Sequence, residues 1–283
     1  MQGPLLFAHR GATLDYTENT LPAFRAALVR GADVLELDVR MSIDGHVIVC
    51  HDPTGKRVYG SDQPVSTTRF SQIKRWSAKS PSGEVCIPAT LPELFDAFPH
   101  AALNIDVKQR RPDMLPVLLD CIVGHAAQER VLLTSFSLRV LQRIRALGYR
   151  GPLGMSRVEA ALALLGPMST ARRVAQGASR LQIPMRYAGL NLATRPCIER
   201  AHELGLQVDY WVVNDPAEAE RLLDLGADGI VTDHPGRIAE VFLRHVRTRA
   251  WRLRRAADKA DSASNGTPAE TARNRPSVPS AAR

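Results

Sequence analysis

The stretch LLFAHRGATLDYTENTLPAFRAALVRGADVLELDVR, residues 5–40, contains two apolar runs separated by an amphipathic segment. The runs at 5–8 and 34–40 are short and rich in Leu, Val and Phe, which is typical of buried strands. Between them, residues 20–31 carry apolar side chains at helical spacing and end on a glycine. A helix between two strands is the crossover that parallel strands need, so this stretch predicts a β/α unit.

The same alternation continues along the chain. Segments with helical spacing, such as 114–125 and 216–226, separate most of the later apolar runs. Eight strands with crossovers over about 240 residues predict an α/β fold, a (β/α)8 TIM barrel. An open doubly wound sheet is the alternative, but the chain has no glycine-rich dinucleotide fingerprint. The later runs are LNIDVK (103–108), VLLTSF (131–136), PLGMS (152–156), LQIP (181–184), QVDYWVV (207–213) and GIVT (229–232).

One apolar run breaks this alternation. HVIVCHD (46–52) follows the second strand after only MSIDG (41–45), which leaves no room for a helix. An Asp-Gly pair is typical of a tight turn between antiparallel strands, so we predict a hairpin that returns His51 toward the C-terminal end of the second strand. The segment at about 53–100 lacks the barrel pattern and predicts a small insertion with two short helices, the second beginning with the capping box TLPE at 90–93.

The positive charge of the chain is concentrated at its C-terminal end. The net charge of +8 would favour nucleic-acid binding if the folded part carried it. Residues 244–283, however, contain ten Lys or Arg and three Asp or Glu, and the rest is near neutral. We therefore predict a barrel domain over 1–243, a basic, disordered tail over 244–283, and no nucleic-acid partner. The tail would give at most a weak contact with an anionic membrane.

Hydropathy and cysteine usage point to the cytoplasm. No stretch approaches the ~18–20 apolar residues of a membrane span, so stable membrane insertion is not expected. The first residues lack the pattern of a removable signal peptide. The four cysteines are widely spaced without a metal or disulfide pattern, as in a reducing compartment. The oligomeric state is not indicated.

Titratable side chains gather where the predicted strands end. His9 follows the first strand, Glu36 and Asp38 lie near the end of the second, Asp106 closes the third, and the hairpin returns His51. Active-site groups of a TIM barrel come from these ends. Histidine moves protons near neutral pH, and carboxylates two apart on a strand share a face and can hold one hard cation. The pattern indicates metal-assisted acid–base chemistry on an anionic substrate.

Structural interpretations of the same residues stay open. Glu36 and Asp38 would also suit a buried salt-bridge layer with Arg10 and Arg40. Asp106 and Lys108, two residues apart, would suit a structural ion pair.

The chain resembles the glycerophosphodiester phosphodiesterases, through motifs in the expected order over about 230 residues. The resemblance implies a TIM barrel with a small insertion after the second strand, in agreement with the strand count. The motifs are HRG (9–11), ENTLPAF (18–24), GADVLELDVRMSIDGHVIVCHD (31–52), TLPELF (90–95), LNIDVK (103–108), SF (135–136), WVVN (211–214) and DGIVTDHP (228–235).

The resemblance also implies catalytic and metal-binding roles. His9 and His51 match the general acid and base of the family. Glu36 and Asp38 match two ligand positions of a divalent ion, Mg2+ or Ca2+. Asp106 matches the third position, where the family often has Glu; Asp is one methylene shorter, so the cation would sit closer or bind through water.

The substrate implied by the resemblance is a small glycerophosphodiester such as glycerophosphocholine, cleaved to sn-glycerol 3-phosphate and an alcohol in glycerol and lipid metabolism. Arg10 and Lys108 match positions that contact the phosphate, and Phe136 and Trp211 match an apolar wall near the glycerol. The attacking group is either the glycerol 2-hydroxyl or water. A lysophospholipase D acting on lysophospholipids is the alternative, but no apolar lip is evident in the sequence.

Overall fold

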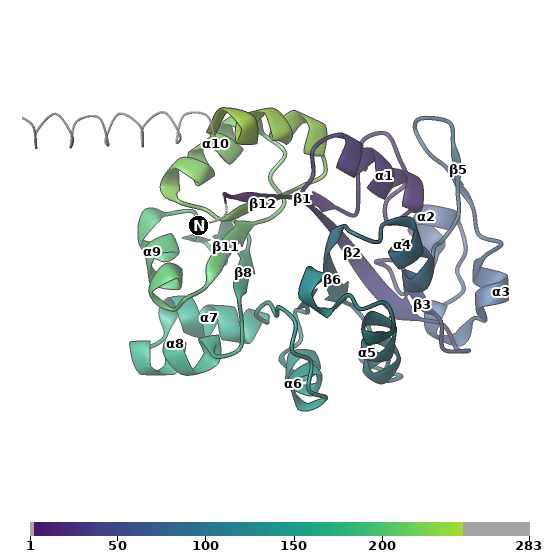
Figure 1. The fold of residues 1–283 in the computed structure, drawn as a ribbon, viewed down its shortest axis with the longest axis horizontal. Coiled ribbons are helices and arrows are strands. Elements are labelled where there is room, and N and C mark those ends of the chain that lie inside the picture. The colour runs from purple at the N-terminus through teal and green to yellow at the C-terminus, as the bar shows by residue number, and fades with distance from the viewer. Residues whose placement is uncertain (1–2, 246–283) are drawn as a thin grey trace, which may run out of the picture. The chain divides into compact units, whose positions relative to one another are not determined.

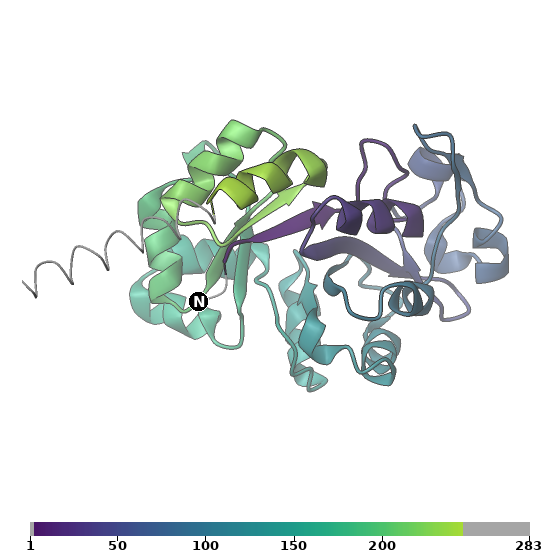
Figure 2. The same ribbon diagram turned by 45° about the horizontal axis from the view of Figure 1, so that its top comes forward.

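A curled parallel sheet forms the centre of the computed structural model, which describes residues 3–245 (Figures 1 and 2). Most of the predicted tail lies outside the described residues, and residues up to Arg244 form one compact unit. Neighbouring strands follow the order β7–β6–β2–β1–β12–β11–β8. Their bounds are β1 Leu5–His9, β2 Val34–Met41, β6 Ala102–Val107, β7 Val131–Thr134, β8 Arg180–Ile183, β11 Gln207–Tyr210 and β12 Gly229–Thr232.

Residues 153–154 close the sheet into a barrel between β7 and β8. Leu153 pairs in parallel with Leu133 of β7, and Gly154 pairs with Arg180 of β8. The predicted strand at 152–156 is thus reduced to two bridges. Gly154 packs closely on its neighbour, since a Cβ there would lie 2.7 Å from the Thr134 side chain. The (β/α)8 barrel predicted from the sequence is confirmed.

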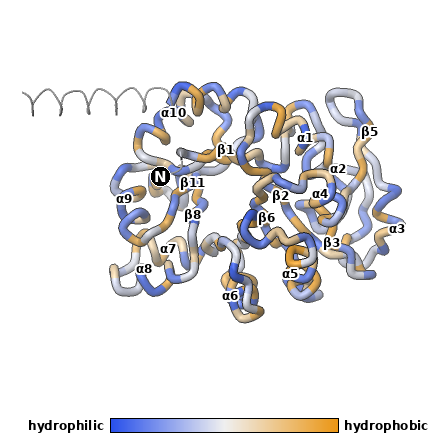
Figure 3. Tube along the Cα trace, viewed as in Figure 1, coloured by the Kyte–Doolittle hydropathy of each residue, from blue (hydrophilic) through white to orange (hydrophobic). Residues whose placement is uncertain are grey.

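Helices cover the outside of this sheet (Figure 1). Most of them place buried apolar residues against the strands, as α5 does with Leu115, Leu118 and Ile122. Figure 3 shows α5 orange over much of its length, whereas α10 carries both colours. None of the helices within residues 3–245 is both long and apolar enough to cross a membrane. The helices are α1 Leu21–Val29, α4 Leu91–Ala97, α5 Leu115–Gly124, α6 Leu138–Ala146, α7 Arg157–Leu165, α8 Met168–Ala175, α9 Arg195–Glu203, α10 Pro216–Leu225, the 3-10 turn η2 Gln128–Arg130, and a helical run at 235–245.

The hairpin after β2 is present as predicted. β3 (Val47–Val49) runs antiparallel to β2, with Val39 opposite Val49. The insertion that follows has a small core of its own around Ile73 and Trp76. It contains more elements than the two helices predicted, because helices of four residues are too short to show periodicity. They are α2 Lys56–Tyr59, η1 Val65–Thr67, α3 Phe70–Ile73 and the pair β4 Ala78–Lys79 and β5 Val85–Cys86, before α4 with its predicted capping box.

A buried ion pair lies inside the second half of the barrel. Arg180 of β8 forms a two-point ion pair with Asp209 of β11, which is completely buried. Gly229 on β12 faces this pair and lacks room for any side chain, since a Cβ there would lie 2.3 Å from Asp209 Oδ1 and 2.7 Å from the Phe7 ring.

We therefore expect Gly229→Ala to lower the free energy of unfolding by about 1–3 kcal/mol through overpacking. Denaturant unfolding followed by circular dichroism measures the change. Gly124→Ala is the matched control, because a Cβ at this helical residue meets nothing within 4 Å; it should leave stability unchanged or raise it slightly. Equal stability of the two variants would contradict this packing.

Candidate active site

The HRG motif forms a sharp turn at the end of β1. Arg10 and Gly11 have φ values of 58° and 95°, in the left-handed region that favours glycine. A Cβ on Gly11 would also lie 2.7 Å from Ala23 Cβ. Both the backbone conformation and the lack of space therefore require glycine here. The turn lets the Arg10 backbone N–H donate to both the carbonyl and the carboxylate of Glu36, on the adjacent strand β2.

His9 is held by a carboxylate that directly follows the last barrel strand, β12. Its Nδ1 is hydrogen-bonded to Asp233 Oδ1 at 2.7 Å, which leaves Nε2 available to a substrate. The Asn214 side chain donates to Asp233 Oδ2 at 2.8 Å and fixes its orientation. Burial alone would lower the pKa of His9, but the hydrogen bond to Asp233 and the charge of Glu36 outweigh it and raise the pKa. His9 thus keeps its proton to a higher pH than a free imidazole.

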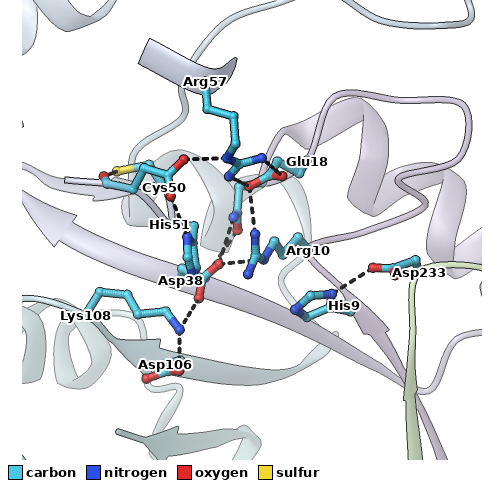
Figure 4. A network of polar contacts seen from close by, with 12 residues as sticks. His9, Arg10, Glu18, Asp38, Cys50, His51, Arg57, Asp106, Lys108 and Asp233 are labelled. Carbon is cyan, nitrogen blue, oxygen red and sulfur yellow. Dashed lines mark hydrogen bonds and ion pairs between the residues drawn. The ribbon is translucent and has the colours of Figure 1, made fainter. Parts of the chain in front are cut away.

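His51 has a similar arrangement built from the hairpin and the insertion. Its Nδ1 is hydrogen-bonded to Asp52 Oδ1 at 2.7 Å, and Arg57 of α2 donates to Asp52 Oδ2 at 2.6 Å. Arg57 also donates two hydrogen bonds to Glu18, which in turn accepts from Arg10 at 3.1 Å. The insertion therefore connects His51 to the HRG turn (Figure 4).

Asp38 and Asp106 share one lysine between adjacent strands. They lie opposite each other in the β2–β6 register. Lys108 Nζ is 3.0 Å from Asp38 Oδ1 and 2.6 Å from Asp106 Oδ2. Arg10 Nε lies 3.1 Å from Asp38 Oδ2, and the Asn19 amide donates to the same oxygen (Figure 4). Two ion pairs that the sequence suggested are thus present, Asp38 with Arg10 and Asp106 with Lys108. Arg40, which was also suggested as a partner, donates instead to the His51 carbonyl.

The carboxylates differ in how well their charge is compensated. Burial, followed by repulsion from Asp38, raises the pKa of Glu36 to about 7. Burial also raises the pKa of Asp106 despite the attraction of Lys108. For Asp38, burial is outweighed by Lys108 and Arg10, and its pKa is lowered. Burial therefore outweighs the neighbouring positive charge at Glu36 and Asp106, but not at Asp38.

The three predicted metal ligands only partly suit a metal in this arrangement. No group of three or more ligand-type side chains within residues 3–245 is positioned to hold a metal ion. Asp38 is occupied by its two cations. Glu36 and Asp106, however, face the same cavity, and Asp106 Oδ1 is buried without a hydrogen-bond partner among the described residues. The donor chemistry of these two side chains suits a hard divalent cation.

The cavity between the strand ends measures about 320 Å³ and has a polar and an apolar side. Its polar side includes His9, His51 and Lys108. On its apolar side the rings of Phe136 and Trp211 lie 5.6 Å apart, centroid to centroid. Of the predicted site residues, only the buried Asp38 does not line this cavity.

Sequence reasoning missed the residues that support the two histidines. Asp233 and Asn214 orient His9, whereas Asp52, Arg57 and Glu18 orient His51. Most of these supporting residues lie inside the recognised motifs. The signal available for them was an acidic residue directly after a strand, as at Asp233, or directly after a histidine, as at Asp52. Arg57 lies in the insertion and carried no signal. Arg157, whose guanidinium lies 4.4 Å from the centre of the Phe136 ring, was also missed.

A TIM barrel whose mouth joins two carboxylate-bound histidines to a cavity lined by Arg10 and Lys108 is the arrangement expected of a barrel phosphodiesterase. The chain belongs to the glycerophosphoryl diester phosphodiesterase family, whose sequence profile matches residues 9–237. The resemblance noted in the sequence is confirmed.

Individual relatives agree with this assignment. The chain is 28% identical over 239 residues to a glycerophosphodiester phosphodiesterase of Caldanaerobacter subterraneus subsp. tengcongensis, covering 82% of this chain and 94% of the relative. It is 27% identical to a lysophospholipase D of Rattus norvegicus, covering 84% and 86%. The crystal structure of a glycerophosphodiester phosphodiesterase from Agrobacterium tumefaciens matches with a TM-score of 0.68 at 26% identity, covering 84% and 98%.

Because Asp233 raises the pKa of His9, we expect Asp233→Asn to lower that pKa. An NMR titration of the His9 ring proton measures the change without any turnover. Asp52→Asn is the matched control, since it removes the carboxylate from His51 and should leave the pKa of His9 in place. An unchanged pKa of His9 in Asp233→Asn would contradict the role given to Asp233.

Proposed function

We propose that this protein hydrolyses glycerophosphodiesters, such as glycerophosphocholine, to sn-glycerol 3-phosphate and an alcohol, with His9 and His51 as acid and base. The observation that carries the proposal is the pairing of each Nδ1 with a carboxylate, while both rings line one cavity. A carboxylate at Nδ1 fixes the tautomer and the orientation of an imidazole, which prepares Nε2 for proton transfer.

The two histidines divide the proton transfers. One accepts the proton of the attacking oxygen, and the other donates a proton to the departing alcohol. The raised pKa of His9 favours His9 as the donor, because it remains protonated where a free imidazole would not. The attacking oxygen belongs either to the glycerol 2-hydroxyl, giving a cyclic phosphate that water then opens, or to water itself.

Cationic side chains stabilise the phosphate. A phosphodiester carries one negative charge, and the transition state carries more, so fixed positive groups lower the barrier. Lys108 and Arg10 both line the cavity. Their ion pairs with Asp38 hold them there and keep their charge in place. The rings of Phe136 and Trp211 would pack against the glycerol carbons.

A divalent cation, Mg2+ or Ca2+, completes the proposal. Glu36 and Asp106 would hold it, and Asp38 would join them only if its contacts with Lys108 or Arg10 open. When bound, such an ion acts as a Lewis acid on the phosphate oxygens. The buried Asp106 Oδ1, which has no hydrogen-bond partner among the described residues, supports this assignment.

We also propose a cytoplasmic location. The four cysteines are free, which supports it.

Replacing either His9 or His51 by Ala should lower kcat by about 10²–10⁴-fold, because each provides a proton transfer. Release of sn-glycerol 3-phosphate from glycerophosphocholine, with Mg2+ or Ca2+ present, measures the loss. His100→Ala serves as the control, as His100 is exposed and outside the cavity. Full activity of His51→Ala would rule out the proposed pair.

Chelation should abolish turnover, and addition of Mg2+ or Ca2+ should restore it. Calorimetric titration of the metal into the chelated protein provides a readout that does not depend on activity. We expect Asp106→Asn to weaken metal binding by at least about tenfold, because it removes a ligand charge. Asp120→Asn, on the exposed side of α5, should bind as the unchanged protein does. Full activity after chelation would contradict the need for a metal.

A further inference from the structure

A second groove opens beside the catalytic cavity and is lined mainly by arginines. We call it the arginine groove. It measures about 860 Å³ and lies among the end of β2, the loop between β6 and α5, and the first turns of α6. These segments follow neighbouring strands, at the end of the barrel where substrates bind. Six cationic side chains line the groove: Arg40, Lys108, Arg110, Arg111, Arg139 and Arg143.

The positive charge of the arginine groove is not balanced by acidic side chains. Among the residues that the structure describes, Asp113 is the one acidic residue in its lining. Asp113 accepts a hydrogen bond from the backbone at the start of α5, and its ion pair with Arg143 is exposed and 3.5 Å long. Arg110, Arg111 and Arg139 are exposed and form no ion pair within residues 3–245. A concave surface with charge of one sign attracts ligands of the opposite sign.

The loop that carries two of these arginines is held in place from below. Gln109 is 95% buried, and its Oε1 accepts a hydrogen bond from the Met41 backbone N–H of β2 at 3.2 Å. Its Nε2 donates to the Pro112 carbonyl at 3.2 Å. The backbone on both sides of Arg110 and Arg111 is therefore fixed, and a ligand need not order the loop when it binds.

The arginine groove and the catalytic cavity meet at Lys108, which lines both. Arg40 adds a second link, because it lines the groove and donates to the His51 carbonyl at 2.9 Å. The glycerol is proposed to lie against Phe136 and Trp211, which do not line the groove. The head group, on the other ester oxygen of the phosphate, can therefore extend past Lys108 into the groove.

We propose that the arginine groove binds a phosphate monoester carried by the head group of the substrate. The enzyme then favours glycerophosphodiesters whose head-group alcohol is phosphorylated. This inference rests on the proposed function, since the diester itself must lie between His9 and His51. The planar guanidinium group donates two parallel hydrogen bonds to a phosphate, so a groove built from arginines suits this anion. A cationic head group such as choline would be repelled by the same charge.

The phosphate in the groove takes no part in the reaction. The oxygen of water ends on the phosphorus of the diester, the bond from this phosphorus to the head-group oxygen breaks, and the alcohol leaves with a proton. The products are sn-glycerol 3-phosphate and the phosphorylated alcohol, by either attacking group. The arginines of the groove thus determine specificity and are not catalytic.

Two substrates that differ only by the second phosphate test the groove. They are glycerophosphoinositol and glycerophosphoinositol 4-phosphate. We expect kcat/KM to be at least about tenfold higher for the phosphorylated diester, because hydrogen bonds to charged groups are strong enough for that factor. The double variant Arg110→Gln/Arg111→Gln should lose most of this preference. Arg172→Gln/Arg173→Gln is the matched control: it makes the same change of charge on the exposed side of α8, outside the groove, and should keep the full preference.

Binding is measured without turnover by calorimetric titration of both diesters into His51→Ala. The phosphorylated diester should bind more tightly, and its advantage should shrink as the salt concentration rises. Inorganic phosphate is added in a separate titration, at the concentration of the diester. A free ion lacks the effective concentration that a covalent link provides, so it should leave the preference in place.

Equal kcat/KM and equal affinity of the two diesters would overturn the proposal, as would equal behaviour of the two double variants. A preference that inorganic phosphate abolishes would show a site for the free ion instead. Loss of binding to anionic vesicles in Arg110→Gln/Arg111→Gln, with both diesters handled alike, would show a membrane contact instead. Tighter binding of the phosphorylated diester without any turnover counts against the proposed function alone, whereas turnover without preference counts against the groove alone.

Discussion

The buried carboxylate of Asp38 is the interaction on which the rest of the site depends. Only 1% of this residue is exposed, and it binds Arg10, Lys108 and Asn19, which come from three segments of the chain. Removing one partner of such a buried pair costs about 3–5 kcal/mol, because the remaining charge is left uncompensated. One carboxylate therefore fixes three segments: the HRG turn, the loop before α1 and the end of β6. It also holds Arg10 and Lys108, two of the cations that line the cavity.

The pairing of the first and last strands, β1 and β12, matters for catalysis as well as for stability. His9 and Asp233 are 224 residues apart in sequence, and they meet only because β1 pairs with β12. His51 depends instead on local contacts with Asp52 and Arg57. One histidine is thus positioned by the global fold and the other by a hairpin and its insertion. A change that weakens the β1–β12 pairing should therefore disturb His9 before His51.

The sequence predicted the barrel well because buried strands and amphipathic helices leave strong patterns. The strand predicted at 152–156 was too long, because apolar character does not show how many of its residues will pair with a neighbouring strand. All of the site residues predicted from the motifs except Asp38 line one cavity. Asp233 and Arg57 were not found, since a supporting residue is defined by what it contacts in three dimensions. The ion pair of Asp38 with Lys108 likewise became visible only with the β2–β6 register.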